Sequence, residues 1–374
     1  MTPLDAALAA LDAQPCPDER AERNRAMARG LMRGYAEHWR DQERVEEGTC
    51  EVVSVEEEFT VPLYNLDTGR KSRTFVTAGR KDIVLARFGK RYVTDHKTTS
   101  EDIGEEGDYF RQLQVEGQAS LYMLAEHLAG NECYGAIWDV IRRPGIRPRK
   151  LTKAEQAAVA SLGTWCGVRV TEATQQHVIK EGAENMELYE IRVARECTED
   201  PSRYFQRKPI VKLQAEMVEY TRELWAIAQE IIDARQHDRW PRSSGACLEY
   251  GACEYLGICS GTVSVDSDRF VRKACVHNEL HTLGGDGRDV LTNTRIKCWQ
   301  SCHRKHFYRY ELGITRADRE ESEAIAFGNL MHTALEAYWK ALQPQEETNA
   351  PDSSPAPCAS AQAELNFDSG ETPF

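Results

Sequence analysis

GRKDIVLARFGKRYVTDHK, residues 79 to 97, is the stretch that decides the fold of this chain. Two short apolar runs, Ile83–Leu85 and Tyr92–Val93, flank a turn at Gly89 and Lys90. Their β-branched and aromatic residues, with a glycine between the runs, predict a β-hairpin. Side chains along each predicted strand therefore alternate between the two faces of the sheet.

The same hairpin carries ionisable side chains in a defined arrangement. Asp95 and Lys97 are two residues apart and share one strand face, whereas His96 points to the other face. The neighbouring strand supplies a second acid, Asp82. Two acids beside a lysine can hold a divalent cation and poise a water molecule, as metal-dependent phosphodiester hydrolysis requires. A plainer interpretation of the D-x-K triplet is a solvated face with a weak ion pair.

The order of the motifs favours the catalytic interpretation. A G-x-x-D motif ending at Asp82 precedes D-x-K, and a helix follows in which Gln118 and Tyr122 share one face. This order resembles the RecB-like branch of the PD-(D/E)XK nuclease superfamily. The resemblance implies that this helix face lines a DNA channel, although an ordinary amphipathic helix would show the same spacing. The catalytic residues that the resemblance implies are Asp82, Asp95, Lys97, Gln118 and Tyr122.

The composition limits the classes of function. At 374 residues the chain has the length of about two domains, or of one domain with a helical insertion. Its net charge of −13 disfavours a protein that coats nucleic acid, but it allows an enzyme with a local basic groove. The sequence has no run of about 18 apolar residues and no G-x-x-x-x-G-K-[ST] loop. We therefore expect a cytoplasmic protein without a membrane span or a helicase motor, and the resemblance to these nucleases implies a bacterial or phage-infected cell.

The cysteines predict a metal site. Twelve cysteines without signs of secretion favour metal binding over disulfides. In CLEYGACEYLGIC, Cys247, Cys253 and Cys259 are each separated by five residues, which suits a compact soft-metal site that requires a fourth ligand. Resemblance to the iron–sulfur RecB-like exonucleases of CRISPR adaptation and phage recombination implies Cys302 as that ligand, with Cys298 as the fallback. The implied cofactor is a [4Fe–4S] cluster, and the alternative is Zn²⁺.

A histidine helix is predicted near the C-terminal end of the chain. In AIAFGNLMHTALEAYWKAL the apolar residues follow helical spacing, and His332 and Glu336 lie on one face. RecB-like nucleases begin with such a helix, which carries a metal-binding histidine, so the order of segments here is changed. The resemblance therefore implies a circular permutation. The alternatives are a truncated nuclease followed by the start of a second copy, in which His332 would act across chains, and a gene-boundary artefact.

The predicted fold is α/β, a restriction-endonuclease-like mixed sheet flanked by helices, with helical additions and a cysteine-ligated cluster. Its segments are residues 1–265, the main part of the core with the acids and the three-cysteine loop; 266–290, a tail-like segment and connector; 291–342, a head-like segment; and 343–374, a disordered tail. Within them we expect helices over 1–45, 108–130 and 210–234, a β-meander over 46–98, and strands over 134–141 and 186–195.

The resemblance also implies a mechanism. Asp82, Asp95 and His332 bind Mg²⁺ or Mn²⁺, and the main-chain carbonyl of His96 supplies a further oxygen ligand. Magnesium retains several water molecules, so few protein ligands are needed. Lys97 orients or deprotonates the attacking water, while the metal offsets charge that develops on the phosphate.

The expected function is that of a metal-dependent DNA nuclease. The resemblance implies an exonuclease that acts on DNA ends or single strands in recombination, repair, phage DNA processing or CRISPR adaptation. Its partners would be DNA and the recombination or CRISPR-adaptation proteins. The competing class is a non-catalytic iron–sulfur or zinc module that binds DNA in a recombination complex. The complete acid, acid and lysine set discriminates between the two classes, because a catalytically inactive relic has no reason to retain it.

Overall fold

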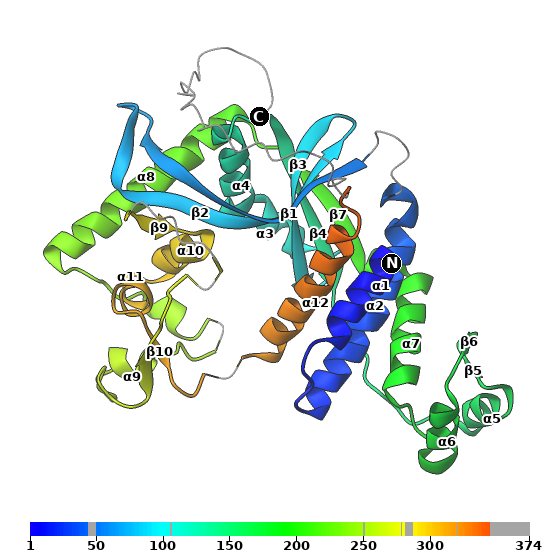
Figure 1. The fold of residues 1–374 in the computed structure, drawn as a ribbon. Helices are drawn as coiled ribbons and strands as arrows, with labels where there is room; N and C mark the ends of the chain where they lie inside the picture. The colour runs from blue at the N-terminus through cyan, green and yellow to red at the C-terminus, as the bar shows by residue number, and fades with distance from the viewer. Residues whose placement is uncertain are drawn as a thin grey trace, which may run out of the picture.

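The computed structural model describes residues 1–43, 50–104, 107–249, 251–277, 279–280, 287–319 and 321–344 (Figure 1). A six-stranded mixed sheet lies at its centre, with strand order β1-β2-β3-β4-β7 and with β9 paired to β2 off this path. The strands are β1 (Cys50–Asn65), β2 (Arg70–Arg87), β3 (Lys90–Thr99), β4 (Cys133–Arg142), β7 (Phe205–Ile210) and β9 (Asp289–Leu291). This architecture confirms the predicted α/β class.

The predicted hairpin is formed by β2 and β3. These strands are antiparallel: Arg87 pairs with Lys90 beside the turn, and Ile83 pairs with Thr94 at the other end of the ladder. The turn therefore lies at Phe88 and Gly89. Strand β4 then pairs parallel to β3. A parallel neighbour requires a crossover connection, and helices α3 (Asp108–Gln114) and α4 (Gly117–Leu128) provide it. The single helix expected over 108–130 is thus two helices, separated at Val115 and Glu116.

Helices cover both faces of the sheet, and each face has its own core. On one face, α3, α4 and α8 (Gln214–His237) pack around buried residues that include Trp138 and Val84. On the other face, Ile83 and Leu85 pack with residues of α1 (Pro3–Asp12), α2 (Glu19–Glu43), α7 (Met186–Glu199) and α12 (Glu323–Lys340). The alternation of Ile83, Val84 and Leu85 between the two cores is the two-residue period expected of a strand.

The strand predicted over 186–195 is wrong, because these residues belong to helix α7. Leu188, Tyr189, Val193 and Cys197 are buried, and their spacing places them on one helical face rather than on alternate sides of a strand. The Asn185 side chain accepts a hydrogen bond from the Leu188 amide and caps the helix. Helix α7 packs against α2, and these two helices form the outer wall beside α1 and α12 (Figure 1).

Two smaller units extend from the core (Figure 1). One is formed by α5 (Lys153–Leu162), β5 (Thr164–Trp165), β6 (Val168–Arg169) and α6 (Glu172–Glu181) around the buried Trp165. The other, here termed the cysteine module, comprises residues 244–249, 251–272 and 293–316. It contains η2 (Ser244–Cys247), α9 (Leu256–Cys259), β8 (Phe270–Arg272), α10 (Asn293–Ser301), α11 (His303–His306), the π-turn η3 (Phe307–Glu311) and β10 (Ile314–Arg316).

The cysteine module joins segments that are distant in sequence. Strands β8 and β10 pair antiparallel, and the Tyr255 hydroxyl donates to the Ile314 carbonyl at 2.7 Å. Among the described helices, none combines the length and the apolar character needed to cross a bilayer. Most of the tail that was predicted to be disordered, residues 345–374, lies outside the described residues.

Candidate metal and catalytic site

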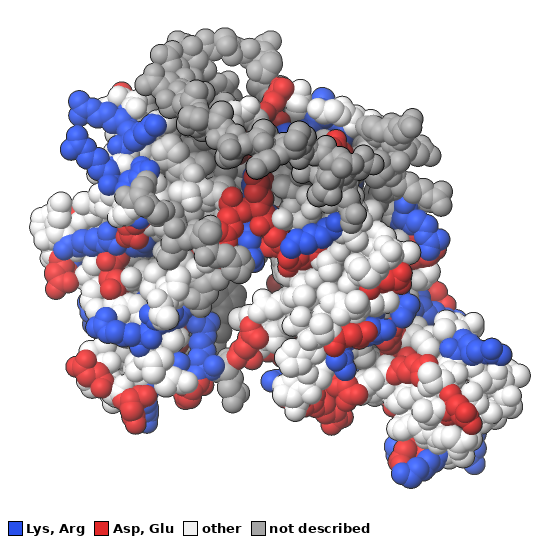
Figure 2. Space-filling model, in the orientation of Figure 1, with Lys and Arg blue, Asp and Glu red and all other residues white. Residues whose placement is uncertain are grey.

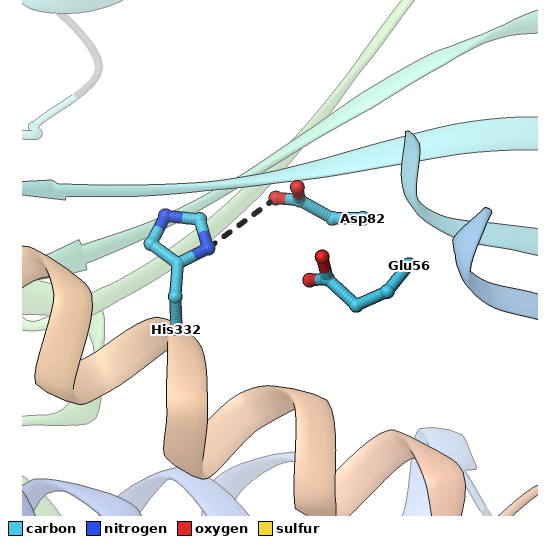
Figure 3. Close-up of side chains that lie close together, drawn as sticks. All are labelled: Glu56, Asp82 and His332. Atoms are coloured by element: carbon cyan, nitrogen blue, oxygen red, sulfur yellow. Dashed lines mark ion pairs between the residues drawn. The ribbon is translucent and has the colours of Figure 1, made fainter. Parts of the chain in front are cut away.

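Three side chains from separate elements converge beside the middle of the β1–β2 ladder (Figure 3). Glu56 of β1, Asp82 of β2 and His332 of α12 place their ligand atoms within 4.8 Å of one another. His332 Nδ1 lies 3.7 Å from Asp82 Oδ2. Two carboxylates and an imidazole form a donor set that suits a divalent cation. The sequence-predicted residues Asp82 and His332 therefore lie together within one chain.

Glu56 is the member of this group that sequence reasoning missed. Glu56 lies opposite Asp82, but these two residues are not paired in the β1–β2 ladder. The pairs on either side of them, Val55–Ile83 and Glu57–Lys81, are formed. The Glu56 backbone has φ of +54°, which is uncommon for a residue with a side chain and is tolerated where the surrounding structure imposes it. In the sequence, Glu56 is one of three successive acids within a predicted strand, and no local signal distinguishes it from Glu57 and Glu58.

Asp95, Lys97, Gln118 and Tyr122 form a hydrogen-bonded network beside the three converging side chains. Lys97 Nζ lies 2.5 Å from Asp95 Oδ2 and donates to Gln118 Oε1 at 2.8 Å. The Gln118 amide nitrogen donates to Asp95 Oδ1 at 2.7 Å and to the Tyr122 hydroxyl at 2.8 Å. The amide of Gln118 thus fixes the acid and the lysine of the D-x-K motif relative to each other.

The two groups of side chains meet where β2 and β3 cease to pair. The ladder ends at Ile83–Thr94, one residue before Asp82 and Asp95. Beyond it, the His96 main-chain amide donates to Asp82 Oδ2 at 2.8 Å instead of to a strand carbonyl. A carboxylate thereby satisfies a main-chain donor that the end of the ladder would otherwise leave without a partner.

The charges in this site are not balanced by the protein alone. Burial raises the pKa of Glu56 to about 7, and the nearby Asp82 carboxylate adds to the shift. Burial likewise raises the pKa of Asp95 to about 7, although the Lys97 ammonium opposes it. The pKa of His332 is lowered, mainly because the ring is desolvated, so the neutral imidazole that binds metals is favoured. Crowded carboxylates beside a neutral histidine fit a bound divalent cation, whose charge would offset the repulsion.

One model of a protein family matches the chain over residues 2–260 and 290–370, and its description is the PD-(D/E)XK nuclease superfamily. The chain belongs to this superfamily. Neither a curated protein nor a solved structure matches it significantly. Membership identifies a metal-dependent nuclease in general, for which DNA is the implied substrate and divalent metal ions are the cofactors.

Two glycines let the elements of this PD-(D/E)XK site approach closely. A Cβ added at Gly79 would lie 2.8 Å from the Phe59 ring and 3.4 Å from Tyr122. A Cβ at Gly328 would lie 3.2 Å from Thr98 Oγ1, so a side chain there would press α12 away from β3. Because α12 carries His332 and β3 carries the D-x-K motif, Gly328 keeps the distance between them short.

Behind the site, His96 points to the opposite face, as predicted, into a buried ionic network. His96 Nδ1 lies 3.2 Å from Asp139 Oδ2, which also accepts from the Tyr35 hydroxyl at 2.5 Å and lies 3.2 Å from Arg207 Nε. Burial would raise the pKa of Asp139, but Arg207 and His96 hold it well below its usual range. Asp139 therefore stays charged and anchors the strand segment whose amide contacts Asp82.

A cavity of about 990 Å³ opens in front of the nuclease site, and the cysteine module forms its far wall. Glu56, Asp82, Lys97 and His332 line one side. The module contributes both signs of charge to the lining, namely Lys297, Lys305, Arg309 and, just beyond β10, Arg319, together with the acids Glu249 and Glu254. Figure 2 shows acidic side chains gathered near the centre of this face, and basic and acidic side chains interspersed over the cysteine module. An anionic substrate in this cavity would thus meet the acids of the candidate metal site on one side and a wall of mixed charge, which includes four cations, on the other.

The predicted cysteine ligands lie in the module but are not gathered as tightly as the acids. The Cys253 amide donates to the Cys247 carbonyl at 2.8 Å, and the Ser243 amide donates to Cys302 Sγ at 3.5 Å. Burial raises the pKa of the Cys259 thiol, with further contributions from Cys253 and Cys302. Among the described residues, no three of these sulfur atoms lie within 4.8 Å of one another. Cys298, the fallback ligand, is buried one helical turn before Cys302.

Proposed function

We propose that this chain is a Mg²⁺- or Mn²⁺-dependent deoxyribonuclease of the RecB-like branch, acting as an exonuclease on DNA ends or single strands in recombination, repair, phage DNA processing or CRISPR adaptation. The convergence of Glu56, Asp82 and His332 beside the Asp95–Lys97 pair carries the proposal. The far wall of the cavity in front of these residues carries four cations, Lys297, Lys305, Arg309 and Arg319, among the acids Glu249 and Glu254, and these cations suit the phosphates of a nucleic-acid strand.

In this proposal each residue has a definite role. Glu56, Asp82 and His332, together with Asp95 and the His96 carbonyl, hold the metal ion. The bound ion supplies a Lewis acid that offsets charge on the phosphate and lowers the pKa of a water ligand. Burial lowers the Lys97 pKa, but the carboxylates of Asp95, Asp82 and Glu116 together raise it above its usual value. Lys97 therefore acts as an ammonium that orients the water and donates to the phosphate. Gln118 and Tyr122 position Lys97 and the strand.

A circular permutation accounts for the order of the segments. His332 belongs to the head-like segment, and it reaches Asp82 of the main part within one chain. Strand β9, at the start of that segment, pairs parallel to β2 in the same sheet. A truncated nuclease followed by a fragment of a second copy would not require these contacts within a single chain.

The test of the function is degradation of end-labelled single-stranded and double-stranded DNA. We expect shortening from the ends in Mg²⁺ or Mn²⁺ and none in EDTA, because the acids require a cation to bind the scissile phosphate. A circular single strand serves as the control for end dependence. Binding without cleavage in either metal would instead establish the non-catalytic DNA-binding module, and cleavage of the circle would contradict exonuclease action.

We further propose that Cys247, Cys253, Cys259 and Cys302 ligate a [4Fe–4S] cluster. Their thiols are free, and those of Cys253 and Cys259 have raised pKa values because they are buried, so a bound metal would be needed to hold them as thiolates. Tetrahedral zinc with Zn–S bonds of about 2.3 Å needs sulfur atoms roughly 3.8 Å apart. The cluster would hold the three-cysteine loop against the segment that begins at Cys302.

Metal content tests this assignment. Protein purified without oxygen should be brown and hold roughly four irons per chain, whereas a single zinc in colourless protein would establish the alternative. Cys253→Ser should lose the metal. Cys133→Ser is the matched control, because Cys133 is a buried thiol of β4 whose Sγ contacts the Gly135 carbonyl. Retention of a full complement of iron in Cys253→Ser would contradict the ligand set.

A further inference from the structure

A second cationic pocket lies where β3 and β4 end, apart from the cavity of the metal site. It has a volume of about 370 Å³, and its lining includes Arg23, Arg142, Arg143, Arg147 and Arg203. Glu323 is the single acid among the described residues that line it. Five arginines around one carboxylate are an unusual concentration in a chain with a net charge of −13.

The backbone of this arginine pocket is fixed by the ends of the strands. The Arg142 amide donates to the Tyr204 carbonyl at 2.8 Å, and the Arg143 amide donates to the Thr99 carbonyl at 2.7 Å. The Arg143 guanidinium is held by Glu323 and lies 4.8 Å from the centre of the Phe327 ring. Arg23 lies 3.5 Å from Glu323, so the first turns of α2 and α12 form one wall.

Two of the five arginines are available to a ligand. Arg142 pairs with Asp102 at 3.1 Å, while Arg23 and Arg143 share Glu323. Arg147 and Arg203 are exposed, and within the described part of the chain neither forms an ion pair with a carboxylate. A guanidinium fork without a carboxylate partner is suited to the oxygen atoms of a phosphate.

The pocket is connected to the metal site by two rigid elements. Helix α12 rises about 14 Å from Glu323 to His332, at about 1.5 Å per residue. Strand β3 continues from Asp95 to Ser100, which lines the pocket, over roughly 17 Å at about 3.3 Å per residue. At about 3.4 Å per nucleotide of a stacked strand, these separations correspond to roughly four to five nucleotides.

We infer that the arginine pocket is a remote phosphate-binding site, which holds the nucleic-acid backbone four to five nucleotides from the phosphate at the metal site. The inference rests on the proposed nuclease function and adds to it a minimum length of substrate. Phosphate contacts fix the register of a strand without reading its sequence. Arg147 and Arg203 therefore contribute affinity and register to any strand long enough to reach them.

Salt-dependent binding tests the inference without any need for cleavage. A fluorescent 20-nucleotide single strand is titrated with the full chain in EDTA at several salt concentrations. In the Arg147→Ser/Arg203→Ser double variant, the slope of log K against log salt should become shallower by about 1.5, and affinity near 0.1 M salt should fall about tenfold. The substituted side chains are exposed, so the fold should persist. The matched control is the Arg195→Ser/Arg316→Ser double variant. Arg195 and Arg316 are exposed, as Arg147 and Arg203 are, but each pairs with an acid and neither lines one of the two pockets.

The outcomes separate this inference from the nuclease assignment. A double variant that binds the strand with the slope and affinity of the wild type overturns the remote site, even if the wild type cleaves DNA. Failure of the wild type to cleave in Mg²⁺ or Mn²⁺ overturns the proposed function, whatever the slopes are. Inorganic pyrophosphate provides a third outcome. If it raises the midpoint of thermal unfolding of the wild type but not of the double variant, while both proteins bind DNA with the same salt slope, the pocket binds a free phosphate compound. The assignment to nucleic acid would then be wrong.

Discussion

Replacing Asp95 by alanine is expected to reduce metal-dependent DNA cleavage on the order of a thousandfold or more. In the structure Asp95 contacts both Lys97 and Gln118, so its loss removes the group that positions the lysine, together with an oxygen that we propose binds the metal. Residues that act as a unit in catalysis commonly show losses of this size when one of them is removed. Initial rates on end-labelled DNA in Mg²⁺ and in Mn²⁺ measure the effect.

Lys97→Ala should cause a loss of similar size, because Lys97 contacts Asp95 directly and, in the proposed mechanism, both act on the same water and phosphate. Asp67→Ala is the matched control, since Asp67 is an exposed acid in the β1–β2 connection whose nearest cation is Arg222 at 3.5 Å. Its rate should equal that of the wild type. If Asp95→Ala or Lys97→Ala cleaves at nearly the wild-type rate while remaining folded, these residues are not the catalytic pair.

The parts of the site that follow strand and helix periodicity were predictable from the sequence. Alternation along β3 places Asp95 and Lys97 on one face and His96 on the other, and the structure shows these orientations. Helical spacing places Gln118 and Tyr122 on one face of α4, and the hydrogen bond between them has the expected i to i+4 separation. These positions depend on local geometry, which a single sequence contains.

Other features depend on tertiary structure and could not be predicted in this way. Glu56 enters the site because its backbone adopts a left-handed conformation within a strand. The surrounding structure imposes this conformation, and no residue type in VEEEF signals it. The pairing of β3, β4 and β7 places His96, Asp139 and Arg207 side by side, and the packing of α2 adds Tyr35, so the network depends on contacts between distant segments. For α7, a short apolar pattern fits strand and helix alike, and the choice is made by burial against α2.

The largest expected effect on stability follows from this buried network. The Asp139 side chain is 0% exposed and contacts Tyr35, His96 and Arg207. The Arg207 side chain is itself only 6% exposed. Asp139→Asn retains the shape of the side chain but removes the negative charge that offsets a buried guanidinium. Removing one partner of a buried ion pair costs about 3–5 kcal/mol, because a charge remains in a medium of low polarity. We expect the free energy of unfolding, measured with urea in EDTA, to fall by about 3 kcal/mol or more.

Tyr35→Phe separates the charge from the hydrogen bond in the same network. It removes the hydroxyl that donates to Asp139 at 2.5 Å and accepts from Arg207 at 2.6 Å, but keeps the Asp139–Arg207 ion pair. At about 1 kcal/mol for each hydrogen bond, the expected loss is about 2 kcal/mol. Asp67→Asn controls for the loss of one negative charge at an exposed position and should leave stability nearly unchanged. A loss below about 1 kcal/mol in Asp139→Asn would show that the charge of Asp139 does not stabilise the fold. The network would then serve only to orient His96, and the strand segment that contacts Asp82 would be held by hydrogen bonds rather than by a buried ion pair.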